Sequence, residues 1–210
     1  MHSAEENTEK PGAEHRRLGI NPRNEGLYPV TTASLFGNGN PLVLEIGSGR
    51  GRFLLQSAKS EPQRNFVGIE KSLHFYRVLV RRLEHAGLSN VQIINYDAVP
   101  VMAEMLPEHS VREIHIYFPD PWPRRREQKR RLIRPEAVEQ MHRVLEPGGF
   151  GVYVTDHRQY FEASLPVLEG CFDVRQESRN DAFARTNYEV KYRQEGRAIH
   201  EVRFFPRKSP

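Results

Sequence analysis

Short apolar runs alternate with helix-like stretches through most of this chain, and this alternation restricts the fold more than any other feature. A run of roughly four to eight apolar residues indicates a buried strand, whereas apolar residues every three or four positions indicate a helix. Parallel strands need such crossover helices, so the pattern predicts a doubly wound, mostly parallel α/β sheet. The predicted strands are residues 41–47, 65–70, 91–97, 111–118 and 150–155, and two tail strands at 172–176 and 198–205 bring the sheet to seven with an antiparallel edge.

The predicted helices fall between these strands. Ser72 is a good N-cap for a helix that runs to Gly87. Apolar residues recur every four positions from Ile133 to Leu145, and the P-G-G at 147–149 is expected to stop that helix. The remaining predicted helices are residues 53–59, 98–106 and 159–169.

Composition limits the class of protein. The chain has 210 residues and one cysteine, Cys171, so an internal disulfide and a cysteine-based zinc site are excluded. No apolar run approaches the roughly 20 residues that span a bilayer, and the polar N-terminus lacks the core of a signal peptide. We therefore expect a cytoplasmic protein with no membrane partner, in which residues 1–34 form a flexible N-terminal arm and residues 35–210 a single domain.

Acidic residues and one glycine stand where the predicted parallel strands end. In doubly wound sheets ligands bind at the carboxyl ends of the strands, so these residues are the first candidates for a site. That several of them share this position is stronger evidence for a site than any single residue. The residues are Glu45, Gly47, Glu70, Asp97, Asp120 and Asp156.

A glycine-rich loop joins the first predicted strand to a helix, with Gly47, Gly49 and Gly51 at alternate positions. Glycines permit a tight turn and a close approach of the backbone to a ligand. Glu70 ends the second strand, where a carboxylate can bind two ribose hydroxyls. Up to this point the pattern fits a dinucleotide.

Two details disfavour a dinucleotide. Arg52 stands where the dinucleotide motif has glycine or alanine, and Glu45 places a negative charge that would repel a pyrophosphate. A cofactor with an ammonium and a sulfonium, S-adenosylmethionine, suits that charge. Asp97 follows the third strand and is expected either to accept a hydrogen bond from the adenine amine or to cap the next helix.

Three prolines stiffen the turn formed by residues 118–123, F-P-D-P-W-P. Each proline fixes φ and lacks an N–H, so the turn can hardly join a helix or a central strand. Such rigidity suits a side chain, Asp120, that must be aimed at a substrate. Trp122 is expected either to stack on a base or to pack the turn onto the domain.

A dense basic run follows this turn. Seven cations and one acid, Glu127, give residues 124–134 a formal charge of +6, whereas the whole chain carries +4, so the excess of positive charge is local. A solvated helix face is the usual explanation of such a run, but here one acid faces seven cations. We expect the run to bind the phosphates of a nucleic acid. Arg126, Arg130 and Arg134 have helical spacing and share one side if the helix that follows begins that early.

These segments together resemble one known family. From about Leu35 to the C-terminus the chain is similar to bacterial tRNA (guanine-N7-)-methyltransferases. The glycine loop alone is a weak signal, whereas F-P-D-P-W-P followed by K-R-R-L is highly specific. The motifs that carry the resemblance are E-I-G-S-G-R-G, G-I-E, N-Y-D-A, F-P-D-P-W-P, the K-R-R-L at 129–132, T-D-H at 155–157 and T-N-Y-E at 186–189.

The resemblance implies a Rossmann-like class I methyltransferase fold, S-adenosylmethionine as the cofactor and a guanosine in the variable loop of tRNA as the target. A tRNA is then the expected partner, bound by a monomer or a homodimer without an obligate protein partner. The cofactor contacts that it implies are Glu45, Glu70, Asp97 and Asp120. The substrate contacts are Arg124, Arg126, Asp156, Thr186, Asn187, Tyr188 and Glu189, and the RNA contacts are Arg125, Lys129, Arg130 and Arg131.

Two positions depart from the pattern of the family. Arg124 stands where the family usually has lysine, and Glu127 where it usually has histidine. Arg124 keeps the charge but presents a planar fork in place of a point donor, and Glu127 lowers the local positive potential. Thr186 and Glu189 also fit a capping box at the start of a helix, which is the structural alternative to substrate contact.

Guanine N7 carries an in-plane lone pair and no proton, so its attack on a methyl sulfonium needs no general base. The enzyme then has to align the reacting atoms and stabilise the positive charge that develops on the guanine. We predict that Asp120 and Asp156 are the catalytic carboxylates, which position the base and do not act as nucleophiles. This chemistry needs no metal, and no cluster of His, Cys or carboxylates has metal-ligand spacing.

Two other functions fit parts of the pattern. A methyltransferase for a protein or a small molecule would explain the cofactor residues, since F-P-D-P-W-P resembles the acidic Asp-Pro-Pro turn of amino-methylating enzymes. The basic run disfavours that function. A non-catalytic RNA-binding module would explain the basic run but leaves the set of Glu45, Glu70 and Asp97 without a role.

Overall fold

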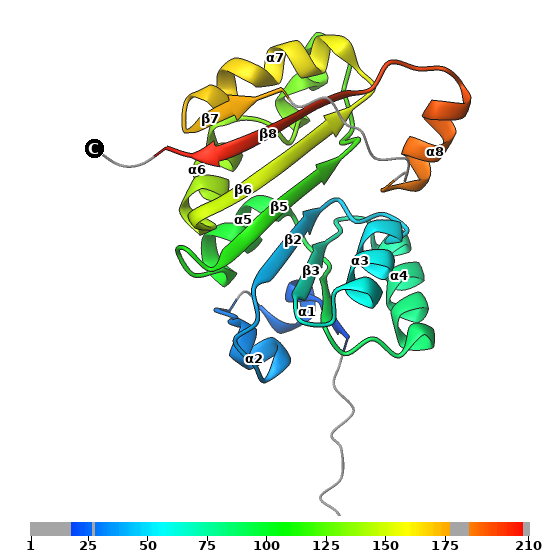
Figure 1. The fold of residues 1–210 in the computed structure, drawn as a ribbon, viewed down its shortest axis with the longest axis vertical. Helices are drawn as coiled ribbons and strands as arrows, with labels where there is room; N and C mark the ends of the chain where they lie inside the picture. Colours follow the sequence, from blue (N-terminus) through cyan, green and yellow to red (C-terminus); the bar gives the residue numbers. More distant parts are fainter. Residues whose placement is uncertain (1–17, 27, 177–184, 208–210) are drawn as a thin grey trace, which may run out of the picture.

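An eight-stranded sheet forms the centre of the molecule in the computed structural model, which describes residues 18–26, 28–176 and 185–207 (Figure 1). The strands are β1 (Gly19–Ile20), β2 (Leu42–Ile46), β3 (Asn65–Ile69), β4 (Val91–Ile94), β5 (Val111–Tyr117), β6 (Leu145–Thr155), β7 (Phe172–Arg175) and β8 (His200–Pro206). Their order is β1-β4-β3-β2-β5-β6-β8-β7. Neighbouring strands are parallel, except that β8 is antiparallel to both β6 and β7.

The predicted doubly wound, mostly parallel class is confirmed, but the strand count differs. The sheet has eight strands because Gly19 and Ile20 pair with Ile93 and Ile94 of β4 at one edge. This strand lies within the segment that we expected to be a flexible arm, so the sheet begins before residue 35. The rest of that expected arm, residues 1–17, lies outside the described residues. At the other edge the antiparallel strand, β8, lies between β6 and β7.

Helices cover both faces of the sheet. The two hydrophobic clusters place α3 and α4 over one face of the sheet and η1, α6 and α7 over the other, and Figure 1 shows α3 and α4 together beside β3. Ser72 is the N-cap of α4, as predicted, and Gly87 ends that helix in the left-handed conformation. The helices are α1 (Pro22–Glu25), α2 (Thr32–Phe36), α3 (Arg52–Ser60), α4 (Leu73–Ala86), α5 (Ala98–Pro100) with the π-helix η1 (Val101–Met105), the 3₁₀-helix η2 (Arg125–Arg130), α6 (Pro135–Val144), α7 (Arg158–Glu169) and α8 (Asn187–Gln194).

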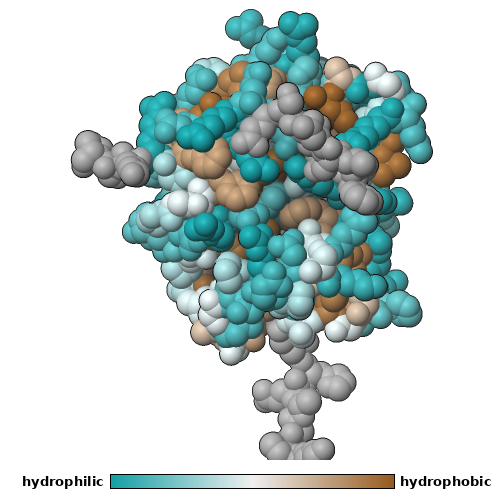
Figure 2. Space-filling view, in the orientation of Figure 1, coloured by the Kyte–Doolittle hydropathy of each residue, from teal (hydrophilic) through white to brown (hydrophobic). Residues whose placement is uncertain are grey.

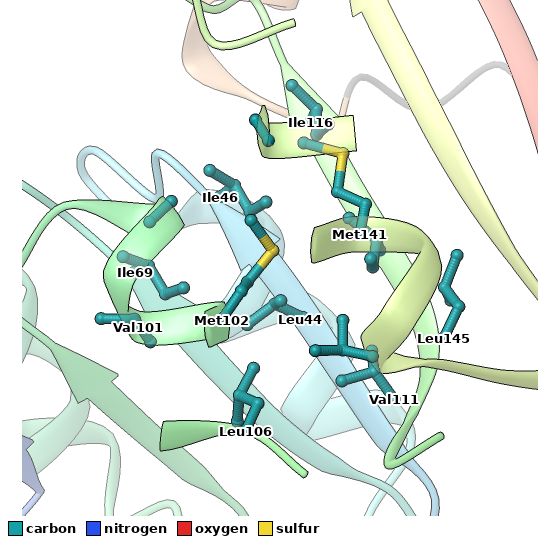
Figure 3. Packing of buried hydrophobic residues seen from close by; sticks show 14 of the residues in the cluster. Leu44, Ile46, Ile69, Val101, Met102, Leu106, Val111, Ile116, Met141 and Leu145 are labelled. Atoms are coloured by element: carbon teal, nitrogen blue, oxygen red, sulfur yellow. The ribbon is translucent and has the colours of Figure 1, made fainter. Parts of the chain in front are cut away.

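The two faces of the sheet belong to two hydrophobic clusters. Successive residues of a strand point to opposite faces, so β2 contributes Val43 to the cluster under α3 and α4. It contributes Leu44 and Ile46 to the cluster under η1 and α6, where they meet Met102 and Met141 (Figure 3). The strands are thus buried on both faces, which explains why they appear in the sequence as nearly continuous apolar runs.

Hydrophilic side chains cover most of the face shown in Figure 2. Among the helices that the structure describes, none is long and apolar enough to cross a membrane. The same residues contain no group of three or more His, Cys, Asp or Glu side chains arranged to hold a metal ion.

Candidate active site

The loop between β2 and α3 needs glycine for two different reasons. Gly47, Gly49 and Gly51 all have positive φ, at 83°, 51° and 70°. A Cβ at Gly51 would lie 2.0 Å from Cδ1 of Leu79 in α4, whereas a Cβ at Gly47 or Gly49 would have no atom within 4 Å. Gly51 therefore allows α3 and α4 to pack closely, and the other two glycines border open space that a ligand can occupy.

Glu45, in β2, is a buried carboxyl group with one unpartnered oxygen. The residue is 2% exposed, and its Oε2 has no hydrogen-bond partner among the described residues. Burial raises the pKa of Glu45 well above its ordinary range, and the nearby Glu70 carboxylate raises it further, against a hydrogen bond from Ser48. A cation beside Glu45 would satisfy the free oxygen and favour the ionised form, so the residue fits a positively charged group of a ligand.

Glu70, directly after β3, ties the glycine loop to the start of α4. Its Oε2 accepts a hydrogen bond from the Gly49 N–H and its Oε1 accepts one from the Ser72 N–H, each at 2.7 Å. Burial raises the pKa of Glu70, and the carboxylate of Asp120 raises it further, although the two hydrogen bonds oppose the shift. Asp120 is therefore close enough to interact electrostatically with Glu70.

Asp97 has an ion-pair partner that the sequence did not indicate. Its Oδ1 accepts a hydrogen bond from the Val99 N–H at 3.2 Å, which makes Asp97 the N-cap of α5. Its Oδ2 lies 2.8 Å from Nζ of Lys71, the residue after Glu70. Burial alone would raise the pKa of Asp97, but Lys71 and the Val99 N–H outweigh it and lower that pKa. The capping alternative is confirmed, and the ion pair brings Asp97 toward Glu70.

The turn at 118–123 has strained backbone on both sides of Asp120. Phe118 and Trp122 have φ values of 49° and 42°, which side chains of this size rarely adopt. Such a conformation costs about 1 kcal/mol or more at each residue, and it persists where the surroundings hold it in place. The Phe118 N–H donates to the carbonyl of Val154 at 2.8 Å. Asp120 itself is exposed.

Arg131 is buried and bonds to the backbone of the turn at 118–123. We predicted that it contacts RNA, but it is 9% exposed and its Nε donates to the carbonyl of Pro121 at 2.9 Å. Its guanidinium also lies 4.7 Å from the ring centroid of Tyr160. Arg131 is therefore a structural residue of the turn, and the basic run loses one of its expected RNA contacts. Its neighbour Arg130 is exposed and lies 4.9 Å from the ring centroid of Trp122.

Arg131→Ala is expected to lower the free energy of unfolding by about 2–4 kcal/mol, because it removes a charge-assisted hydrogen bond and a partly desolvated cation–π contact. Denaturant unfolding followed by circular dichroism measures this loss. Arg130→Ala is the matched control and should change the stability by less than about 1 kcal/mol, since Arg130 is exposed. Equal losses in the two variants would contradict the structural role of Arg131.

Residues Arg125–Arg130 of the basic run form a 3₁₀-helix, η2, and the α-helix that follows, α6, begins only at Pro135. Arg126, Arg130 and Arg134 therefore do not form the expected row, because a 3₁₀-helix aligns residues three apart. The cations remain accessible: Arg124, Arg125, Arg126, Lys129 and Arg130 are all exposed. The two residues that depart from the family pattern face each other, with Nη1 of Arg124 4.0 Å from Oε1 of Glu127.

Asp156, directly after β6, is held by Arg197, three residues after the end of α8. Its Oδ2 lies 2.8 Å from Nη1 of Arg197, and the Arg197 guanidinium covers the ring of Tyr192 at 4.4 Å. Tyr192 in turn packs edge-on against Phe118, with ring centroids 5.4 Å apart. A chain of contacts thus joins Asp156 to the turn that carries Asp120.

The T-N-Y-E segment begins α8, and its members have different environments. Thr186 caps the helix by accepting a hydrogen bond from the Glu189 N–H at 3.1 Å. Glu189 is fully buried, and its carboxylate accepts hydrogen bonds from the Arg185 N–H at 2.8 Å and from Arg193 at 2.7 Å. This burial contradicts the predicted substrate contact of Glu189. Of the predicted capping box, the Thr186 half is present, whereas the Glu189 carboxylate bonds to the N–H of Arg185, one residue before the N-cap. Asn187 and Tyr188 are exposed.

Four residues of this region were missed by the sequence analysis. Lys71 pairs with Asp97, and Tyr192 and Arg197 link α8 to Asp156, as described above. Arg52, at the start of α3, donates to Oδ1 of Asn187 at 3.5 Å and so joins the glycine loop to α8. Lys71 and Arg52 follow directly on predicted site residues, Glu70 and Gly51, whereas Tyr192 and Arg197 stand in no motif.

The chain is similar to a family described as "Putative methyltransferase", whose profile matches residues 39–202. It is 37% identical over 182 residues to a tRNA (guanine-N(7)-)-methyltransferase of Nitrosococcus oceani, covering 85% of this chain and 77% of that protein. The corresponding protein of Bordetella pertussis is 32% identical over 227 residues, covering 96% of this chain and 89% of its own length.

A solved structure adds evidence on the fold. The aminoglycoside resistance methyltransferase NpmB1 superimposes with a TM-score of 0.61 at 17% identity, covering 86% of this chain and 95% of that one. At this identity the likeness shows a common fold and nothing finer. The identity to the curated relatives extends over most of both sequences. The chain therefore belongs to the tRNA (guanine-N(7)-)-methyltransferase family.

Proposed function

We propose that this protein transfers a methyl group from S-adenosylmethionine to N7 of a guanosine in the variable loop of tRNA, at position 46 of the tRNA. The observation that carries the proposal is the gathering of Glu45, Glu70 and Asp120 beside a glycine loop that borders open space. Membership of the family supports the same activity and a cytoplasmic location, where tRNA is available.

The residues at the strand ends fit the cofactor group by group. The unpartnered oxygen of Glu45 suits the cofactor's ammonium, and Glu70 suits the ribose hydroxyls because each of its oxygens retains a free lone pair. Asp97 keeps acceptor capacity for the adenine amine beside its bonds to Lys71 and Val99. When bound, S-adenosylmethionine supplies an electrophilic methyl group on a sulfonium.

Asp120 and Asp156 would hold the guanine. Both carboxylates can accept hydrogen bonds from the N–H groups of the base and so orient N7 toward the methyl group. The negative charge of Asp120 would also stabilise the positive charge that develops on the guanine. The strained turn fixes Asp120 before the substrate arrives, which keeps the cost of reorganisation small.

Exposed groups around the site would bind the RNA. Arg124, Arg125, Arg126, Lys129 and Arg130 are accessible to phosphates, which fix the position of the RNA more than they read its sequence. At the start of α8, Thr186, Asn187 and Tyr188 are the remaining candidates for contact with the substrate nucleotide. The target base has to leave its stack to reach Asp120, and an exposed Tyr188 can stack on it or on a neighbour.

Arg197→Ala is expected to lower kcat/KM for tRNA roughly three- to tenfold, because Asp156 loses the cation that positions it; the effect is modest because the Arg197 side chain is about half exposed. Arg197→Lys should recover part of the loss, since an ammonium also pairs with Asp156. Arg207→Ala, which breaks a distant ion pair with Asp173, is the control and should leave kcat/KM unchanged. Unchanged kinetics in Arg197→Ala would remove Arg197 from the proposal.

The function is tested with the purified chain, S-adenosylmethionine labelled in its methyl group and unmodified tRNA transcripts. Nucleoside analysis should find the label in 7-methylguanosine, and a transcript with adenosine at position 46 should accept none. Label in the protein fraction, or at another atom of the RNA, would contradict the proposal. Titration with S-adenosylhomocysteine should give one-to-one binding, and its absence would favour an RNA-binding module without catalysis.

A further inference from the structure

One side of α4 carries a row of two arginines and two histidines. His74, Arg77, Arg81 and His85 follow one another at intervals of three, four and four residues, and all four are exposed. Residues with this spacing lie on the same side of a helix, here the side opposite the buried residues of α4. At 1.5 Å of rise per residue the row is about 16 Å long. We call these four residues the α4 row.

The charge of this row is not neutralised within the part of the chain that the structure describes. Neither Arg77 nor Arg81 forms an ion pair there, although Glu84, the one acid in α4, is exposed on the same side three residues after Arg81. Arg158 of α7, in contrast, forms an ion pair with Glu162 one turn further along its helix, at 2.8 Å. A helix face that serves solubility alone usually mixes both signs of charge. On this side of α4 the two arginines, Arg77 and Arg81, stand against one acid, Glu84, so an excess of positive charge remains.

The row lies beside the glycine loop between β2 and α3, which we call the cofactor loop. Leu79 of α4 packs under Gly51, and Arg82 donates a hydrogen bond to the carbonyl of Arg50 in the loop. In the sheet, β3 and β5 flank β2 on opposite sides. The helix that follows β3 and the basic run that follows β5 therefore stand on different sides of the loop that ends β2, and Figure 1 shows α4 on the outer side of α3.

We infer that the α4 row is a second phosphate-binding surface for the tRNA, separate from the basic run at 124–130. This inference rests on the proposed function. The basic run would hold the backbone near the reacting guanosine, and the α4 row would hold a different part of the same RNA on the other side of the cofactor loop. Two separated phosphate contacts fix the orientation of a large folded RNA, which one contact leaves free to rotate.

The test compares Arg77→Ala/Arg81→Ala with wild-type enzyme in steady-state methylation of tRNA at several salt concentrations. The affinity for RNA falls as the salt concentration rises, and each lost phosphate contact makes the slope of log affinity against log salt less steep by about 1. The slope of the double variant should therefore be less steep by about 2. The KM for tRNA should rise roughly tenfold at physiological salt. The kcat at saturating tRNA and the affinity for S-adenosylhomocysteine should remain at the wild-type values.

Lys59→Ala/Arg207→Ala is the matched control, because it removes two exposed cations from the end of α3 and the end of β8 and changes the net charge equally. The inference is overturned if the α4 variant shows the same dependence of affinity on salt as the wild type. It is also overturned if the control variant weakens that dependence as much as the α4 variant does. A wild-type protein that does not methylate tRNA would instead overturn the proposed function. Arg77→Gln/Arg81→Gln replaces the alanine variant if thermal unfolding shows that the latter is destabilised.

Discussion

Asp120→Asn is expected to lower kcat for tRNA methylation by about 100-fold or more, since it removes the negative charge that stabilises the cationic guanine. Asparagine keeps the shape of the side chain, so the turn should retain its geometry. Asp120 is exposed, and its replacement should leave the unfolding temperature close to that of the wild type. Single-turnover methylation with saturating tRNA and S-adenosylmethionine measures the chemical step directly.

A control and a second readout make this prediction specific. Glu104→Gln removes a different exposed carboxylate, in η1, and should leave kcat unchanged. Asp120 raises the pKa of Glu70, so in Asp120→Asn the pKa of Glu70 should fall and the acid limb of S-adenosylhomocysteine binding should move to lower pH. A kcat close to the wild-type value in Asp120→Asn would remove Asp120 from the chemistry.

The sequence was sufficient to predict which acidic residues gather at one edge of the sheet because of one topological fact. Parallel strands end on the same edge of a sheet, so residues that follow separate strands come together in space. Glu45, Glu70 and Asp120 are far apart along the chain, yet each influences the pKa of another or is influenced by it. The identity of the strands, and hence this convergence, follows from apolar runs that are buried on both faces.

Side chains whose partners are distant in sequence could not be predicted in the same way. Arg131 looks like any other cation of its run, but its partners are the carbonyl of Pro121 and the ring of Tyr160. The ion pair of Asp156 with Arg197 joins residues 41 positions apart through a helix end that no motif marks. Charge and spacing indicate which residues can meet a ligand, whereas burial depends on the packing of the whole domain.

The end of α6 and the start of β6 were also predicted wrongly. The P-G-G at 147–149 was expected to end a helix, but α6 already ends at Val144 and β6 begins at Leu145 and runs through these residues. A Cβ at Gly149 would lie 2.7 Å from the carbonyl oxygen of Arg112, so glycine here permits a close approach of β5 to β6 at an irregular register. The same glycine can end a helix or join a sheet, and only the neighbouring strand decides between them.

Gly51→Ala should be the most damaging single substitution in the cofactor loop, with a loss of about 2–5 kcal/mol in the free energy of unfolding. The added Cβ would lie 2.0 Å from Cδ1 of Leu79, a fully buried side chain with little room to move. The left-handed backbone at this position, with φ of 70°, adds to the cost. Denaturant unfolding measures the stability, and calorimetric titration measures the accompanying loss of S-adenosylhomocysteine affinity.

Gly47→Ala separates the two roles of the loop. It has the same type of backbone strain, with φ of 83°, but the added methyl group meets no protein atom within 4 Å. Its stability should therefore fall by only about 1–2 kcal/mol. Its affinity for S-adenosylhomocysteine should fall at least about tenfold, because the methyl group enters the space that we assign to the cofactor. If Gly47→Ala binds S-adenosylhomocysteine as tightly as the wild type, the open space beside the loop is not the cofactor site, and the assignments of Glu45 and Glu70 fall with it.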